Sequence, residues 1–143
     1  MLGCCACTRR TALASLAAAG VALTTRAKAA PAEHREFIDA AFRMKDDAVR
    51  AGDQPFGAVL VMDGRVLGFG PSRVVQKSDP YAHAEREAMR EAQARLGRSD
   101  LSGAILYSTS RACPACEAGA ADANVARMFY GSTAVDAGRP RRY

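Results

Sequence analysis

Four residues of this 143-residue chain have the types and the spacing of a metal-assisted hydrolytic site. His83 and Glu85 lie near the start of one amphipathic stretch, and Cys113 and Cys116 lie near the start of another. Two thiolates and one imidazole are suitable ligands for zinc, and three protein ligands leave one tetrahedral position open. An open position is typical of a catalytic zinc ion rather than a structural one. The residues therefore predict a zinc centre where two helix starts meet.

Glu85 is a carboxylate on a helical stripe that is otherwise apolar. The other residues of the stripe, at helical spacing, are Met89, Ala92 and Leu96. Beside a zinc-activated water, a carboxylate can accept a proton and pass it on, so we interpret Glu85 as a proton shuttle rather than a ligand. A helix that began at Pro80 would set His83 and Glu85 roughly 200° apart. We therefore expect the helix to begin near His83, after a bent entry at residues 79–82.

The cysteine pair is compatible with two chemistries. At a helix start, free N–H groups and the helix dipole lower the pKa of a thiol and favour metal-binding thiolates. A Cys-x-x-Cys pair by itself is also typical of a thioredoxin-like redox protein. It is not a haem attachment site, because Glu117 rather than histidine follows Cys116. Taken with His83 and Glu85, the pair favours a zinc hydrolase, with a thiol redox protein and a catalytically retired zinc-binding module as rivals.

The hydrophobic patterning predicts an α/β domain with a mixed sheet of about four to five strands. Asp63-Gly64, between two apolar runs, fits a type I′ turn and predicts an antiparallel hairpin. Alternation of strand and helix in the second half predicts parallel pairing through a crossover helix. The expected helices are residues 32–51, 83–96 and 114–124, and the expected strands are residues 56–62, 65–69, 104–108 and 126–130, with a loop at 71–78. We expect a three-layer α/β/α sandwich, with Phe37, Val49 and Phe56 among its apolar contacts.

The motifs resemble those of the cytidine/deoxycytidylate deaminase superfamily. "HAE" at residues 83–85 and "CPAC" at residues 113–116 match its H-x-E…P-C-x-x-C signature. "PFGAVLVMDG" and "DPYAHAE" are most similar to the branch that holds guanine deaminases and tRNA adenosine deaminases. The resemblance implies a three-layer fold, one bound zinc ion per chain and hydrolytic removal of an exocyclic amine.

The resemblance also assigns roles to individual residues. It makes His83, Cys113 and Cys116 the zinc ligands and Glu85 the general acid/base. Three further positions match substrate-contacting positions of the family: backbone groups near Ala58 and Ala84, and Ser72 where an asparagine is usual.

Two departures from the family pattern concern the substrate pocket. Before the first cysteine, this branch usually has Glu-Pro, whereas this chain has Arg111-Ala112, which alters the pocket wall and adds a positive charge. The sequence also ends about a dozen residues after the strand at Phe129. We therefore expect the fifth strand and the C-terminal helices of the family to be absent, which implies a more open site or one completed by a partner chain in a homodimer.

The N-terminal 29 residues have the layout of an export signal. Arg9-Arg10 precedes an apolar stretch at residues 12–23, and Ala27-Lys28-Ala29 forms a small-x-small cleavage site. The stretch is shorter than the roughly 18 apolar residues that a transmembrane helix needs. The paired arginines resemble a twin-arginine signal, and an ordinary secretory signal is the alternative. We expect a mature domain at residues 30–143 that is periplasmic or secreted and has no membrane attachment.

The charge distribution argues against a nucleic-acid partner. The formal net charge is +5, but residues 1–29 contain four basic residues and no acid, which leaves 16 basic against 15 acidic residues. The one remaining basic cluster, Arg139, Arg141 and Arg142, is interpreted as a solvated terminus because no aromatic residues are interleaved with it. We therefore expect a small-molecule substrate.

Overall fold

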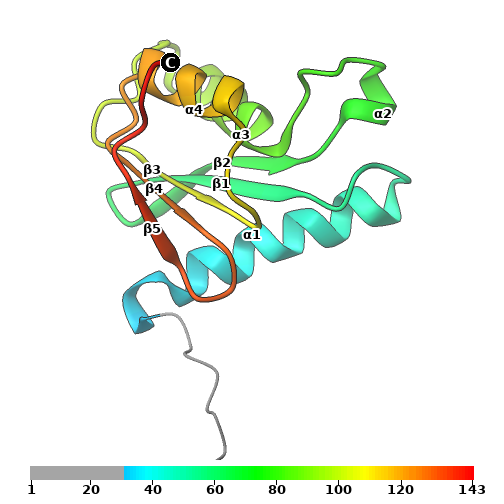
Figure 1. Ribbon diagram of the computed structural model, residues 1–143, viewed down its shortest axis with the longest axis horizontal. Helices are drawn as coiled ribbons and strands as arrows, with labels where there is room; N and C mark the ends of the chain where they lie inside the picture. Colours follow the sequence, from blue (N-terminus) through cyan, green and yellow to red (C-terminus); the bar gives the residue numbers. More distant parts are fainter. Residues whose placement is uncertain (1–30) are drawn as a thin grey trace, which may run out of the picture.

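A five-stranded mixed sheet, in the order β2-β1-β3-β4-β5, forms the middle of the domain. The structure is a computed structural model that describes residues 31–143, so the predicted export signal lies outside the described residues. The elements are α1 (Ala32–Arg50), β1 (Gly57–Met62), β2 (Arg65–Pro71), α2 (Val74–Lys77), α3 (Ala84–Leu96), β3 (Ile105–Ser108), α4 (Pro114–Asp122), β4 (Arg127–Tyr130) and β5 (Val135–Gly138). α1 covers one face of the sheet, and α3 and α4 cover the other (Figure 1). The predicted three-layer α/β/α sandwich is confirmed. None of the helices in residues 31–143 has both the length and the apolar character that a membrane crossing requires.

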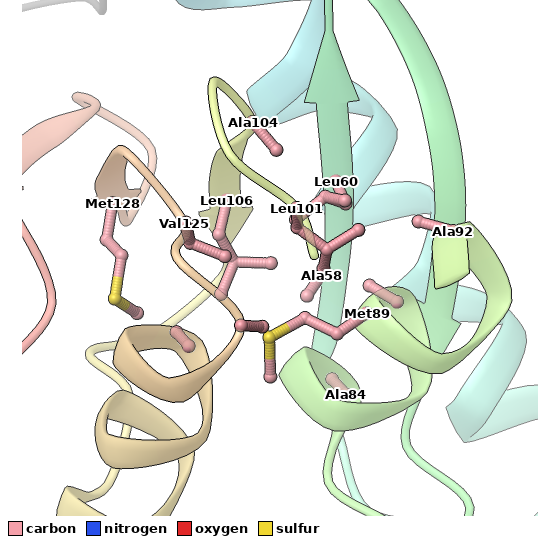
Figure 2. Close-up of a cluster of buried hydrophobic side chains, with 13 residues drawn as sticks. Ala58, Leu60, Ala84, Met89, Ala92, Leu101, Ala104, Leu106, Val125 and Met128 are labelled. Atoms are coloured by element: carbon pink, nitrogen blue, oxygen red, sulfur yellow. The ribbon is translucent and has the colours of Figure 1, made fainter. Parts of the chain in front are cut away.

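Two apolar cores lie on the two faces of the sheet, because successive residues of a strand point in opposite directions. Leu60 and Leu106 belong to the core beneath α3 and α4, whereas Val59 and Tyr107 belong to the core beneath α1. Figure 2 shows the first core, in which Leu60 and Leu106 point into the same space as Met89 of α3. The sheet is thus covered on both faces, as its nearly continuous apolar strands require.

The strand pairings follow the predicted pattern. β1 and β2 are antiparallel, and both turn residues between them have positive φ, 51° at Asp63 and 71° at Gly64, as a type I′ turn demands. β3 and β4 are parallel and are joined through α4. The hairpin and the crossover predicted from the sequence are therefore both confirmed.

The expectation that the fifth strand is absent is wrong. After the turn at Gly131, residues 135–138 pair antiparallel with β4, and Arg127 forms an ion pair with Asp136 across the two strands at 2.5 Å. This strand has four residues, of which the first three are exposed. A strand this short and this exposed carries no apolar alternation, which is the signal that identifies a half-buried strand in a sequence.

Three smaller expectations also need correction. The segment expected as a loop at residues 71–78 contains the short helix α2. Val49 is 52 % exposed, since it lies in the last turn of α1, and helical periodicity predicts a face but not how far the sheet covers it. Phe56 is 42 % exposed rather than part of the core, because it precedes β1 instead of lying within it.

α3 lies against β2 with no space for a side chain between them. A Cβ atom at Gly68 would lie 1.9 Å from the carbonyl oxygen of Ala88, and one at Gly70 would lie 2.0 Å from that of Ala84. Both distances are far below van der Waals contact, so only glycine permits this approach. Because α3 begins at Ala84, the contact at Gly70 fixes where the helix start lies, and with it the residue just before it, His83.

We expect Gly70→Ala to lower the free energy of unfolding by about 3 kcal/mol or more, because the added methyl group forces α3 away from β2. Urea denaturation followed by circular dichroism measures the change. Gly119→Ala in α4 is the matched control, since its Cβ would meet nothing closer than 3.8 Å. The control should be neutral or stabilising by roughly 0.5–1 kcal/mol. Equal stability of Gly70→Ala and the parent would contradict the packing described here.

Candidate active site

The starts of α3 and α4 bring one histidine and two cysteines together. His83 is the residue before α3, Cys113 is the residue before α4, and Cys116 lies in the first turn of α4. The Nδ1 atom of His83 is 3.6 Å from the Sγ atom of Cys113 and 3.3 Å from that of Cys116. All three potential ligand atoms lie within 4.8 Å of one another, and both thiols are free rather than joined in a disulfide.

Local sequence explains why both helices begin where they do. Asp79 closes a turn before α3: its side chain accepts a hydrogen bond from the backbone N–H of Tyr81, and its carbonyl oxygen accepts one from that of Ala82. The helix therefore starts at Ala84, as predicted, after a bent entry. Pro114 occupies the first position of α4, where a residue without an N–H is tolerated.

The three donors fit a zinc ion. One imidazole nitrogen and two sulfurs form a ligand set typical of zinc, and bond lengths of about 2.0 Å and 2.3 Å at tetrahedral angles would separate nitrogen from each sulfur by about 3.6 Å. The two measured separations of 3.3 Å and 3.6 Å are close to this value. The donor atoms therefore already converge at nearly the spacing that coordination requires.

Burial has the largest effect on the pKa of the Cys116 thiol. Burial raises this pKa, and the negative charge of Glu85 and the hydrogen bond with Cys113 raise it further. Without a cation, desolvation of the buried sulfur thus outweighs the favourable helix start, which is worth only about 0.3–1 kcal/mol at an exposed position. A fully buried thiolate needs a cation close by, which a metal ion held by the same residues would provide.

Glu85 is buried beside this cluster. It is 6 % exposed, and its stripe partners Met89 and Ala92 are buried with it. Burial raises the pKa of the Glu85 carboxyl, against the smaller lowering effects of its own backbone N–H, the charge of His83 and a hydrogen bond from Cys116. A buried carboxyl with a raised pKa next to metal-binding residues has the properties of a proton-transfer group.

One pocket exposes this cluster to solvent. It contains about 420 Å³ of space, its mouth open to solvent included. The lining residues are Gln54, Phe56, Ser72, His83, Ala84, Glu85, Ser110, Arg111 and Cys113. The pocket thus brings together two of the three substrate positions suggested by the sequence, Ser72 and Ala84. Ala58 is not among the lining residues, because it is fully buried in the core beneath α3.

Asp53 is a buried carboxylate that the sequence analysis did not single out. Its Oδ1 atom accepts hydrogen bonds from the Ser72 hydroxyl (2.9 Å) and the Gln54 backbone N–H (2.8 Å). Its Oδ2 atom accepts hydrogen bonds from the backbone N–H groups of Val75 and Gln76, each at 3.0 Å. Two of these four donors, Ser72 and Gln54, belong to pocket-lining residues. Asp53 therefore ties the two loops that form one wall of the pocket.

No local signal in the sequence reveals this role. Gly52-Asp53 reads as an ordinary turn, and three of the four donors come from residues about 20 positions further along the chain. Although burial raises the pKa of Asp53, the hydrogen bonds from Gln76, Gln54, Ser72 and Val75 together hold it below its usual value. The carboxylate form is therefore the one that the fold stabilises.

Comparisons with known proteins place these residues in a family context. Residues 31–132 match the family described as the cytidine and deoxycytidylate deaminase zinc-binding region. Over 105 residues the chain is 37 % identical to a guanine deaminase of Bacillus subtilis, with 73 % of this chain and 67 % of that protein covered. Over 101 residues it is 38 % identical to a tRNA-specific adenosine deaminase of Agrobacterium fabrum, with coverages of 71 % and 66 %. The chain therefore spans about two thirds of the length of these relatives.

Solved structures give the same picture. The Bacillus subtilis guanine deaminase structure superimposes with a TM-score of 0.67 at 37 % identity, over 70 % of this chain and 64 % of that one. A structure from a study of tRNA:A34 deaminases superimposes with a TM-score of 0.66 at 37 % identity, over 68 % of this chain and 71 % of that one. Both superpositions thus support the cytidine deaminase-like fold of this chain.

We expect Asp53→Asn to lose about 1–3 kcal/mol of stability near neutral pH, because an amide cannot accept all four hydrogen bonds at charged strength. The folded state lowers the pKa of Asp53, so its contribution is full above the unfolded value and is lost as the pH falls through the folded value. The difference in unfolding free energy between parent and variant should therefore shrink below about pH 4. Urea denaturation at a series of pH values measures it.

Asp63→Asn is the matched control for this experiment. Asp63 is exposed in the β1–β2 turn, where asparagine is equally suitable. The free energy of unfolding of the Asp63→Asn variant should equal that of the parent at every pH. A difference for Asp53→Asn that stays constant down to about pH 3 would refute the role of the ionised carboxylate.

Proposed function

Because the chain belongs to the cytidine and deoxycytidylate deaminase family, we propose that it is a zinc-dependent hydrolase that releases ammonia from a small nucleobase, nucleoside or related amino-heterocycle. The observation that carries this proposal is the convergence of three ligand atoms beside a buried carboxylate at the wall of one pocket. In the proposal, His83, Cys113 and Cys116 hold one zinc ion per chain, and Glu85 is the general acid/base.

A zinc ion held by His83, Cys113 and Cys116 would supply the Lewis acidity that activates water near neutral pH. Glu85 lines the same pocket as His83 and Cys113, within reach of a reacting group placed there. Its carboxylate accepts a proton from the attacking water and returns it to the nitrogen of the departing amine. A C–O bond forms, the C–N bond breaks, and ammonia leaves.

The hydroxyl of Ser72 can act toward a substrate as a hydrogen-bond acceptor but not as a donor. Its hydroxyl proton is donated to Asp53, so the hydroxyl can offer a ligand only the lone pairs of its oxygen. An acceptor at this position suits a ring N–H or an amino group. The hydroxyl therefore takes part of the role that an asparagine has in the related enzymes, but it offers no donor of its own while Asp53 is ionised.

The charge of residues 30–143 favours a small substrate over tRNA. The relatives include proteins named for each kind of substrate, guanine and tRNA. Residues 30–143 carry 16 basic and 15 acidic residues, whereas tRNA binding relies on an excess of positive charge. The near-neutral charge supports a small molecule rather than tRNA as the substrate. A homodimer stays a prediction.

We also propose that residues 1–29 export the domain by the twin-arginine route, on the strength of Arg9-Arg10, the mild apolar stretch and the Ala27-Lys28-Ala29 site. Replacing Arg9-Arg10 by Lys-Lys should retain the protein in the cytoplasm, because the twin-arginine route requires the pair. Immunoblots of periplasmic and cytoplasmic fractions measure this. Unchanged export of the Lys-Lys variant would indicate the ordinary secretory route instead.

We expect Glu85→Gln to keep stoichiometric zinc and to lose deaminase activity by about 10²- to 10⁴-fold, because the amide cannot carry the proton. Zinc is measured by inductively coupled plasma mass spectrometry and turnover by ammonia release. Glu91→Gln is the matched control: Glu91 is on the same helix, but its carboxylate accepts hydrogen bonds from Phe69 N–H and Arg95, away from the pocket.

The same two measurements separate the rival functions. Ammonia release that survives in Glu85→Gln would refute the assigned role of Glu85. Stoichiometric zinc with no ammonia from any nucleobase, nucleoside or pterin would indicate a retired zinc-binding module. A protein without stoichiometric metal, whose dithiol cycles with disulfide reagents, would indicate a redox function.

A further inference from the structure

Arg111 lies at the wall of the pocket on a loop whose backbone is held in place. The loop joins β3 to α4, and Ser110, Arg111 and Cys113 all line the pocket. The Ser108 hydroxyl donates a hydrogen bond to the carbonyl oxygen of Ser110 at 2.6 Å. The neighbouring Thr109 exchanges hydrogen bonds with Gly57 at the start of β1, at 2.9 Å and 3.2 Å. The point from which the Arg111 side chain extends is therefore fixed relative to the zinc ligands.

The guanidinium group of Arg111 has no partner within the described part of the chain. Among residues 31–143, no ion pair or side-chain hydrogen bond engages its guanidinium group. Glu117 lines a small cavity next to Arg111, yet both of its carboxylate oxygens have other partners. The Oε1 atom accepts hydrogen bonds from the backbone N–H and the Nε atom of Arg141, at 3.3 Å and 3.2 Å, and the Oε2 atom accepts one from the Tyr143 hydroxyl at 2.6 Å.

The remaining polar residues of the pocket do not balance this charge. Gln54, Ser72 and Ser110 are neutral, and the one acid in the lining, Glu85, is buried beside the zinc ligands. Arg111 itself is exposed, so a ligand in the pocket can reach it from solvent. The pocket therefore has a proton-transfer group at its inner wall and an unpaired cation at its mouth.

We propose that the substrate is an amino-heterocycle that carries an anionic group, either a carboxylate or a phosphate, and that Arg111 binds this group. The inference rests on the proposed function, because it assumes that the amine-bearing carbon lies beside His83 and Glu85. A guanidinium group can donate two parallel hydrogen bonds to either anion, and its planar fork fixes the anion's orientation. Arg111 thus sets specificity without taking part in proton transfer.

Matched pairs of compounds test the proposal. One arm compares cytidine, adenosine and guanosine with their 5′-monophosphates, and the other compares pterin with pterin-6-carboxylate. Dissociation constants are measured by isothermal titration calorimetry on zinc-loaded Glu85→Gln, in which turnover is expected to be about 10²-fold or more slower. In at least one pair, we expect the anionic member to bind about ten-fold or more tightly than the neutral member. The arm in which this happens identifies the anion as phosphate or carboxylate.

Substitutions then assign the preference to Arg111. Adding Arg111→Gln to Glu85→Gln should abolish the preference for the anionic member and leave the affinity of the neutral member unchanged. Arg111→Lys should restore part of it, and added salt should weaken it in the parent. Arg98→Gln is the matched control, because Arg98 is an exposed arginine that contacts Met62, which is not a pocket-lining residue.

The possible failures can be told apart. Equal affinity for both members of every pair, or equal weakening of both by Arg111→Gln, would overturn the inference about Arg111. Ammonia release from neutral compounds alone would overturn the inference while leaving the proposed function intact. An Arg111-dependent preference in binding, without ammonia release by the parent protein from any compound, would overturn the proposed function and leave an anion-binding pocket.

Discussion

The close contact of α3 with β2 is the constraint on which the site depends. At Gly68 and Gly70 the helix backbone touches the strand backbone, and no other residue type fits there. A helix held this closely cannot shift along the sheet without a steric clash. Its first residue therefore occupies a fixed place, and His83 and Glu85 are held against the start of α4. Gly68 and Gly70 thus position the proposed metal centre through their contact with α3, although neither is among the three potential ligands.

The four buried acids of the described chain have different partners, and the differences separate structural from chemical roles. Asp53 accepts hydrogen bonds from the loops of the pocket wall, Glu87 pairs with Lys77 and Arg90, and Glu117 accepts hydrogen bonds from the C-terminal tail. Glu85 has no lysine or arginine partner among residues 31–143 and faces His83 and Cys116 instead. Burying an acid in this way is unfavourable for the fold, which is typical of a group retained for chemistry.

The C-terminal residues form contacts with α4 that the charge pattern of the sequence did not predict. The cluster interpreted as a solvated terminus returns to α4, where Arg141 contacts Glu117 and Arg142 forms an ion pair with Asp122 at 2.6 Å. Figure 1 shows the C-terminus beside this helix. The same contacts engage the carboxylate of Glu117, which lines a small cavity together with Arg111. The tail therefore leaves the charge at the pocket mouth available to a ligand.

The sequence by itself determined the family, the layers of the fold and the candidate residues for metal binding and proton transfer. The resemblance to the deaminase superfamily is confirmed by the match over residues 31–132. The site residues could be found because their signals are local. They lie in two short motifs, His83–Glu85 and Cys113–Cys116, and each motif is at a helix start. A turn precedes the first helix, and a proline occupies the first position of the second. Periodicity likewise revealed the helices and the longer strands, because burial of one face repeats within a few residues.

Only the tertiary structure decided which groups are buried and which are paired. The role of Asp53 depends on amides about 20 residues away, and that of Glu117 on a tail about 24 residues away. β5 was missed because its four mostly exposed residues carry no apolar alternation. Burial raises the pKa of the Cys116 thiol, and burial is a property of the whole fold. Hydrogen bonding and desolvation act through space, so such partners are not readable from the order of residues along the chain.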